Sequence, residues 1–239
     1  DALPRLEATL GKTHPLTVEA LALLSVSFER TGDYVAAEPL ASDALARARA
    51  SSGVNDPSTF FAVLALSNIR IALARFAEAE ADLKPAYETS LTTPGEASEI
   101  SLALARALAT IYLGTGKFRD GIAVIERADA VVRQHYPPTS GFRHVIQGTL
   151  VALLLSAGRY TEAEPASAAL LDTIRQVRGP DNRDALNVAA NHAILLTNMG
   201  RYAEAEALYN QSYPSLLRLL APDHQEVLTH RNNLALVHI

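Results

Sequence analysis

Several residue types are missing or rare in this chain, and each absence excludes a class of structure or partner. Cysteine is absent, which excludes a disulfide framework and thiol chemistry. Lysine occurs only at Lys12, Lys84 and Lys117, no basic stripe is present and the formal net charge is −5, so nucleic acid is not an expected partner. Apolar runs stay well short of the ~18 residues that span a bilayer, and no signal peptide is visible. We therefore expect a cytoplasmic protein with no membrane partner.

Motifs that carry catalysis or bind metal are also missing. The sequence has no Gly-x-Ser-x-Gly elbow for a nucleophilic serine. A glycine-rich segment resembles a phosphate loop, but Ile111 stands where that motif needs its first glycine and Phe118 where it needs Ser or Thr. His224, His230 and His238 would be separated by ~9 and ~12 Å along one helix, which is too far to share an ion. We expect no metal, no cofactor and no enzymatic activity.

A short turn sequence is present in their place, and it returns at a fixed interval of 42 residues. It usually reads Gly, any residue, then an aromatic, although Ala74 replaces the glycine of the second copy. The aromatic residues are Tyr34, Phe76, Phe118, Tyr160 and Tyr202. Apolar residues at helical spacing flank each turn and predict two helices, in the first copy over 17–30 and 34–50. A period of this length indicates stacked helix pairs, none of which buries its apolar face alone.

Five complete repeats and a half-repeat at each end account for residues 1–239 as one elongated all-α domain. Residues 1–12 read as the end of a helix, and the last stretch, from Pro222, reads as a first helix without its partner. We therefore expect a piece of a longer protein. Its end helices should expose apolar residues such as Leu234 and Val237, which makes a homodimer through the ends possible.

Helix boundaries and bends are predicted from capping residues and prolines. Asp33 and Asp56 are suited to cap the helices that follow them. Two further pairs have the spacing of a capping box: Asp181 with Asp184, and Asp223 with Glu226. Pro85 and Pro214 fall inside predicted helices, where a proline costs ~3 kcal/mol and bends the helix, so we predict a kink at each.

The repeats resemble the tetratricopeptide repeat. Nine positions before the aromatic, four of the five repeats have a small residue. Three positions after the aromatic, most repeats have alanine. The 42-residue spacing, with His14-Pro15 and Asp223-His224 in the turns, is similar to the kinesin-light-chain-like subclass. The resemblance covers the whole chain and implies a right-handed α-solenoid of antiparallel helix pairs. Arg70 and His192 depart from it, because they stand where other repeats carry apolar residues.

The resemblance also implies a function. Such arrays bind proteins or peptides, usually in a concave groove lined by the first helices, and bacterial examples are often joined to kinase, nucleotide-switch or transcription-factor modules. We expect a non-catalytic protein- or peptide-binding scaffold. Two alternatives stay open: the chain senses a peptide or small-molecule signal for a larger regulatory protein, or another domain of the same chain occupies the groove.

Groove residues carried over from the resemblance lie fifteen, twelve, eight and five positions before each aromatic. The candidate partner-binding residues are Phe61, Leu64, Asn68, Ile71, Arg106, Thr110, Leu113, Asn187 and Ile194. The apolar members are suited to anchor side chains of a peptide and the polar members to hold its backbone. The alternative is that some of them face a neighbouring helix and belong to the core. A clamp for carboxylate tails is not expected, because only Asn68 and Arg106 fit it loosely.

Glutamates follow the aromatic in most repeats. They are Glu38, Glu78, Glu80, Glu162, Glu164, Glu204 and Glu206. Paired carboxylates are also the groups of acid–base catalysis. Here they are expected in the first turn of each second helix, where the helix dipole favours negative charge, and their repetition favours this structural interpretation.

Overall fold

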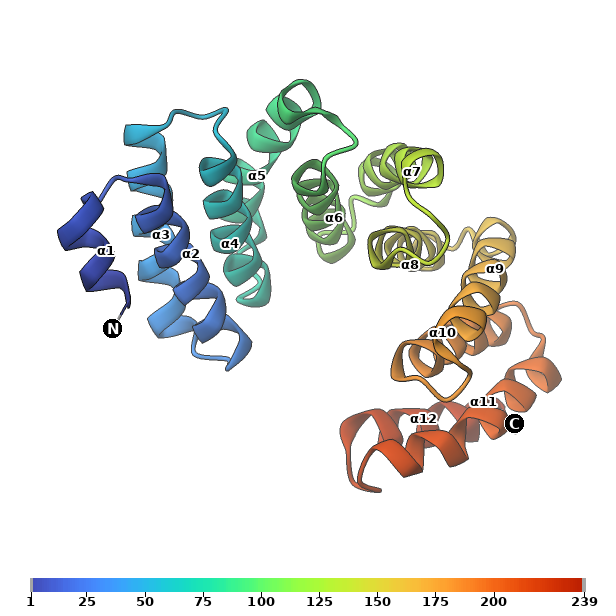
Figure 1. Ribbon diagram of the computed structural model, residues 1–239. Coiled ribbons are helices and arrows are strands. Elements are labelled where there is room, and N and C mark those ends of the chain that lie inside the picture. The colour runs from blue at the N-terminus through green and yellow to red at the C-terminus, as the bar shows by residue number, and fades with distance from the viewer. Residues whose placement is uncertain (1, 238–239) are drawn as a thin grey trace. The chain divides into compact units, whose positions relative to one another are not determined.

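The computed structural model describes residues 2–237, and these fold into twelve α-helices and one short π-helical turn, without a strand (Figure 1). The first helices are α2 (Pro15–Arg30), α4 (Pro57–Ala72), α6 (Glu99–Gly114), α8 (Gly141–Ser156), α10 (Arg183–Asn198) and α12 (Gln225–Val237). The second helices are α1 (Ala2–Leu10), α3 (Tyr34–Ser51), α5 (Phe76–Ser90), α7 (Phe118–His135), α9 (Tyr160–Arg178) and α11 (Tyr202–Leu219). The turn η1 (Leu91–Gly95) follows α5. The predicted all-α fold of helix pairs is confirmed.

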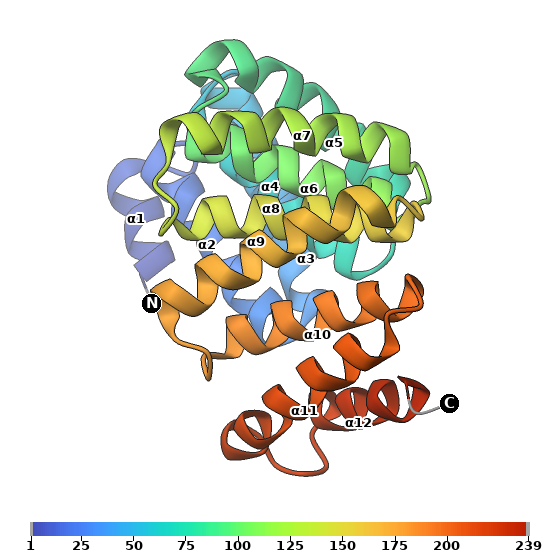
Figure 2. The ribbon, with the colours of Figure 1, turned by 90° about the vertical axis from the view of Figure 1, so that its right-hand side faces the viewer.

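The chain divides into an N-terminal block, residues 1–131, and a C-terminal block, residues 132–239, with the boundary inside α7. In the N-terminal block the consecutive helices α1 to α6 pack against one another in chain order, and α4 also contacts both α2 and α6. In the C-terminal block α8 to α12 pack in chain order, and α10 also contacts α12 (Figure 2). Within a block, therefore, first helices contact first helices, as stacked repeats require.

The five predicted aromatic residues are the first residues of α3, α5, α7, α9 and α11. Before four of them the glycine of the turn has a positive φ, for example +79° at Gly32 and +72° at Gly116. Only glycine adopts this left-handed conformation without steric cost, so it ends the first helix and turns the chain into the second one. The repeat register predicted from the turns is correct to the residue.

Ala74 occupies this turn position with a φ of +56°, the one positive φ of a non-glycine residue in the described chain. The left-handed conformation costs an L-residue about 1–2 kcal/mol, whereas the extra freedom of an unfolded glycine costs about 0.4–1 kcal/mol. Ala74→Gly is therefore expected to raise the free energy of unfolding by about 0.5–1 kcal/mol, measured by urea denaturation. The matched reverse change, Gly116→Ala, should lower the free energy of unfolding. An added Cβ meets no atom within 4 Å at Gly116, so only backbone strain acts there. A lower stability of Ala74→Gly would contradict this account.

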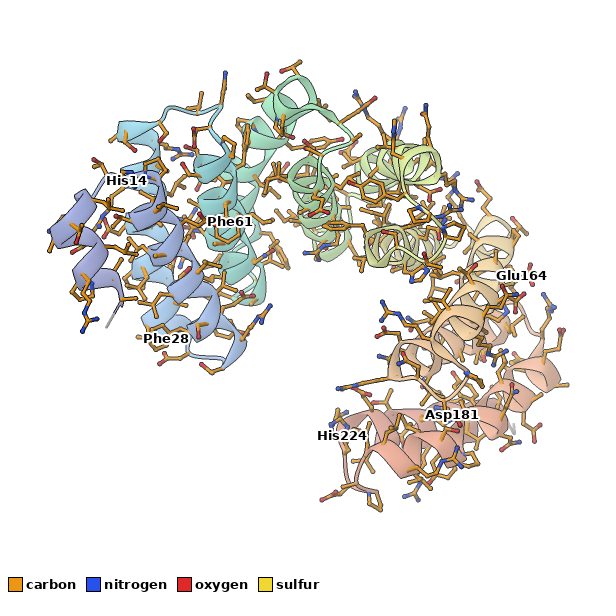
Figure 3. All side chains as sticks on the ribbon, viewed as in Figure 1. His14, Phe28, Phe61, Glu164, Asp181 and His224 are labelled. Atoms are coloured by element: carbon orange, nitrogen blue, oxygen red, sulfur yellow. The ribbon has the colours of Figure 1, made fainter. Side chains whose placement is uncertain are left out.

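The residue before each first helix is the N-cap, and it also recurs every 42 residues, at His14, Asp56, Ser98, Ser140, Asn182 and His224. Asp56 Oδ1 accepts a hydrogen bond from the amide of Ser58 at 2.9 Å, as predicted. In the same position, Nδ1 of His14 and of His224 accepts from the amide two residues on, at 3.3 and 3.2 Å (Figure 3). The histidines of these two turns therefore satisfy free helix N–H groups.

Asp33 is confirmed as the N-cap of α3, with Oδ1 3.1 Å from the amide of Ala36. The two predicted capping boxes are wrong. Asn182, not Asp181, caps α10, because α10 begins at Arg183, and the carboxylate of Asp181 accepts hydrogen bonds from Ser215 and Arg218 of α11 instead. His224, not Asp223, caps α12.

Prolines lie inside four of the second helices, at Pro39, Pro85, Pro165 and Pro214. The helical conformation continues through each of them. A proline withholds one N–H from the helix and crowds the preceding turn. The kinks at Pro85 and Pro214 stay predictions.

Small residues fill the contacts between helices. On α3 the alanines at 37, 41, 44 and 48 have no solvent exposure, and Ala79 of α5 is likewise fully buried. The larger core residues, such as Phe60, Leu83 and Tyr209, are almost completely buried as well.

Within residues 2–237 no helix is both long enough and apolar enough to cross a membrane.

Candidate functional site

The candidate residues of the N-terminal block lie along α4 and α6, and all seven are half-buried. Phe61 of α4 is partly exposed (Figure 3), whereas Phe60 beside it has no exposure, and Leu64 likewise alternates with the buried Val63. Because α4 packs between α2 and α6, these side chains lie on a face made by three first helices. We call this surface the α4 face, defined by Phe61, Leu64, Asn68, Ile71, Arg106, Thr110 and Leu113.

Arg106 and Glu29 bring opposite charges to the α4 face. Burial lowers the pKa of the Arg106 guanidinium on α6 and raises the pKa of the Glu29 carboxyl on α2, and the attraction between the two charges opposes both shifts. The hydroxyl of Thr110 donates to the carbonyl of Arg106 at 2.9 Å, so it is used within its own helix. The polar groups best suited to meet a partner here are therefore Asn68, Arg106 and Glu29.

The other two candidate residues, Asn187 and Ile194, line a pocket of about 370 Å³ in the C-terminal block. It lies between α10, α11 and α12. Its lining is Leu186, Asn187, Ala190, Asn191, Ile194, Ser212, Leu216, Gln225, Glu226, Thr229, His230 and Asn233. The apolar members come from α10 and α11, and most of the polar members come from α12. The structure thus combines two predicted residues with a polar wall that was not predicted.

Thr229 of α12 was missed because the last half-repeat has no aromatic residue from which groove positions are counted back, whereas Glu226, His230 and Asn233 lie at none of the four groove positions. For Thr229 the 42-residue register contains the missing signal. Thr229 occupies the repeat position of Asn187, and Asn233 occupies that of Asn191. Both pairs line the pocket from neighbouring first helices.

His230 lies under the pocket with 4% of its surface exposed. Its Nε2 is 2.9 Å from the carbonyl oxygen of Tyr209. Its ring lies nearly perpendicular to that of Tyr209, with the ring centroids 4.9 Å apart, and stacks on Tyr213 with the centroids 5.7 Å apart. Since a carbonyl only accepts, we assign the hydrogen to Nε2, which leaves Nδ1 as an acceptor. Burial lowers the pKa of His230, so the ring is neutral at pH 7.

Glu226 brings a negative charge to the pocket. Its Oε1 is paired with Arg183, and this hydrogen-bonded arginine lowers the pKa of the Glu226 carboxyl, which stays ionised at neutral pH. Its Oε2 is buried and has no hydrogen-bond partner among the described residues. A buried oxygen of this kind favours a donor.

The stability of the C-terminal block should fall as the pH falls below about 6.5, the unperturbed pKa of histidine. Burial lowers the folded-state pKa of His192 and of His230, so the unfolded chain binds more protons in this range. The stabilisation is complete above the unfolded pKa and is lost as the pH decreases towards the folded values. Urea denaturation at pH 7.5 and 5.5 measures the loss, and His192→Gln combined with His230→Gln should flatten it. An equal loss in that variant would assign the effect to other groups.

The glutamates near the turns form ion pairs between consecutive repeats. Arg75 contacts Glu38 of the preceding repeat at 2.6 Å and Glu78 of its own turn at 2.5 Å, and Arg201 repeats this pattern with Glu164 and Glu204 at 3.0 and 2.6 Å. Glu78, Glu162 and Glu204 lie in the first helical turn as predicted, whereas Glu38, Glu80, Glu164 and Glu206 lie in the second. Arginine lowers the pKa of Glu78 and of Glu204, which is the opposite of what a general acid needs. These carboxylates have a structural role.

Within residues 2–237 no group of three or more His, Asp or Glu side chains is placed to hold a metal ion. His238, considered above with His224 and His230, lies outside the described residues. The glycine-rich segment that resembles a phosphate loop is the turn between α6 and α7, and its Lys117 is paired with Glu80 at 2.8 Å.

Comparisons with known proteins agree on one family. Two family models, both described as tetratricopeptide repeat, match residues 143–218 and residues 1–53. A search of curated proteins found no significant match.

Solved structures with a similar fold include nearly identical TPR-like repeats of a candidate kinesin light chain from Podosopora anserina, at a TM-score of 0.76 and 17% identity over 87% of this chain and 99% of that chain. A signal-transduction ATPase with a tetratricopeptide-repeat sensor, from Pyrococcus horikoshii, matches with a TM-score of 0.74 and 16% identity, over 98% of this chain and 35% of that chain. A Rap protein bound to competence and sporulation factor matches with a TM-score of 0.72 and 12% identity, over 98% of this chain and 66% of that chain. At these identities the likeness shows the fold alone.

Proposed function

Because the chain belongs to the tetratricopeptide-repeat family, we propose that it is a non-catalytic module that binds a protein or peptide on the faces of its first helices. The observation that carries this proposal is the exposure pattern of α4. Phe61, Leu64 and Ile71 stay half-exposed on a helix whose larger apolar residues Phe60, Val63, Leu66 and Ile69 are buried.

The energy available on the α4 face fits reversible binding. Complete burial of a large apolar side chain contributes about 1.5–3 kcal/mol, and these residues have part of their surface left to bury. A few such anchors, with Arg106 and Glu29 to orient the partner, must also offset the entropy lost on association. Affinity is therefore expected to depend on two or three side chains rather than on the whole face.

Selection of peptides from a random display library tests the proposal. The wild type is compared with the double variant Phe61→Glu, Leu64→Glu, and with Val35→Glu on α3 as the control, since Val35 is 88% exposed and lies on a second helix. Peptides that bind the wild type and Val35→Glu should lose at least tenfold in affinity for the double variant, about 1.4 kcal/mol. Equal binding to all three proteins would move the site away from the α4 face.

Other expectations from the sequence stay predictions. They are the cytoplasmic location, a homodimer through the end helices, occupation of the groove by another domain of the same chain, and the absence of nucleic acid among the partners. A role as sensor of a peptide or small-molecule signal has no separate observation in its favour.

A further inference from the structure

The pocket between α10, α11 and α12 has an apolar wall suited to an aliphatic chain. Leu186 and Leu216 are buried beneath it, while Ala190 and Ile194 are half-exposed at its surface. Apolar side chains of this size pack against methylene groups, such as those of the long stems of lysine and arginine. The pocket is large enough for one such side chain.

The polar lining is rich in hydrogen-bond acceptors. His230 carries an acceptor at Nδ1, because its Nε2 donates to the carbonyl of Tyr209. Glu226 has the buried Oε2 that no described residue contacts by a hydrogen bond. The hydroxyl of Ser212 already donates to the carbonyl of Leu208 at 2.8 Å. The carboxamides of the lining both donate and accept, whereas Nδ1 of His230 and the carboxylate of Glu226 only accept, so these two groups favour a ligand that donates hydrogen bonds.

Charge favours the same kind of ligand. Glu226 is the only charged side chain among the described residues that line the pocket, and no lysine or arginine lines it. Arg183 binds the other oxygen of Glu226 from outside the lining, with 56% of its side chain exposed. A carboxylate ligand would meet Glu226 without a cation, whereas an ammonium or guanidinium group forms a charge-assisted hydrogen bond with it.

We infer that this pocket binds a basic side chain, lysine or arginine, of the partner peptide, with the stem on Ala190 and Ile194 and the cationic group at Glu226. The carboxamides of Asn187, Asn191 and Asn233, placed around it on two first helices, hold the main chain of the same peptide. This inference names the partner class of one site and rests on the proposed function. It selects basic peptides, the opposite sign from a carboxylate clamp.

The test uses four small probes that share a short alkyl chain: n-butylguanidinium, n-butylamine, valeramide and valerate. Each is titrated into the whole ¹⁵N-labelled protein at constant ionic strength, and amide shifts of α10 and α12 report binding. The two cations should bind at least about fivefold more tightly than valeramide, and valerate most weakly. Saturable shifts should centre on Ala190, Ile194, Glu226 and His230.

Three variants separate charge from shape. Glu226→Gln should lower the affinity for the cations to that for valeramide, without changing valeramide binding. Arg183→Gln removes the competing cation and should strengthen cation binding at least about twofold. Glu204→Gln, which removes an equivalent ion-paired carboxylate away from the pocket, should behave as the wild type. Unchanged ¹⁵N spectra outside α10–α12 show that each variant is folded.

Several results would overturn the inference: valeramide binding as tightly as the cations, valerate binding best, cation binding insensitive to Glu226→Gln, or no saturable shift with any probe. The library selection separates this failure from failure of the proposed function. Peptides that bind the wild type without enrichment in Lys or Arg would leave the proposed function standing and refute the inference. Cation binding in the pocket with no peptide selected would support the cation site at Glu226 and refute the proposed function, and with it the use of the site for a peptide.

Discussion

Replacing Tyr209 with alanine is expected to lower the free energy of unfolding of the C-terminal block by about 3–5 kcal/mol. The Tyr209 side chain is 1% exposed and packs in a cluster with Ala193, Leu196, Ala205 and Val237. The predicted exposure of Val237 is therefore wrong, because α12 packs this residue against α10 and α11. The Tyr209 ring also forms a T-shaped contact with the His230 ring. Alanine would leave a cavity where α10, α11 and α12 pack together. The neighbouring side chains, two of them alanines, are too small to fill it.

Urea denaturation followed by circular dichroism measures this loss, and hydrogen exchange locates it. The control is Tyr209→Phe, which keeps the ring and removes only the hydroxyl, so its cost should be about 0.5–1.5 kcal/mol. Protection of α10–α12 should collapse in Tyr209→Ala while amides of α2–α4 keep theirs, since each repeat contacts only its neighbours. A loss below 1 kcal/mol for the alanine variant would contradict the cluster as described.

Replacing Ala79 with leucine is expected to destabilise the N-terminal block by about 1–3 kcal/mol through overpacking. Ala79 stands three residues after Phe76 and has no exposed surface on α5, which packs against both α4 and α6. The added carbons have no empty volume to enter, so the helices must separate or the side chain must leave its preferred rotamer.

Thermal unfolding of Ala79→Leu beside Ala77→Leu checks this result. Ala77 lies on the same helix but is exposed, so its replacement changes helix propensity and hydrophobicity without changing packing. The expected outcome is a lower melting temperature for Ala79→Leu alone. An unchanged value would mean that the alanine three positions after the aromatic does not mark the helix contact.

The repeat allowed only part of the candidate site to be predicted. Asn187 and Ile194 were predicted because the groove positions are counted back from Tyr202, and they do line a pocket. Glu226, His230 and Asn233 were not predicted, because none of them lies at one of the four groove positions of the 42-residue register. Their chemistry depends on contacts across helices: the tautomer of His230 is set by the carbonyl of Tyr209, and the charge of Glu226 by Arg183.

The sequence by itself determined the all-α fold, the 42-residue register and the first residue of every complete second helix. These features follow from local chemistry: a turn residue with positive φ, a following aromatic and apolar residues at helical spacing each act within a few positions of the chain. Only the tertiary structure decided which side chains stay half-exposed on α4, that Asp181 meets Ser215 rather than its own helix, and that Glu38 and Arg75 join two repeats. These outcomes depend on how one helix lies against another, and residues 34 and 37 positions apart come into contact only after the repeats have stacked.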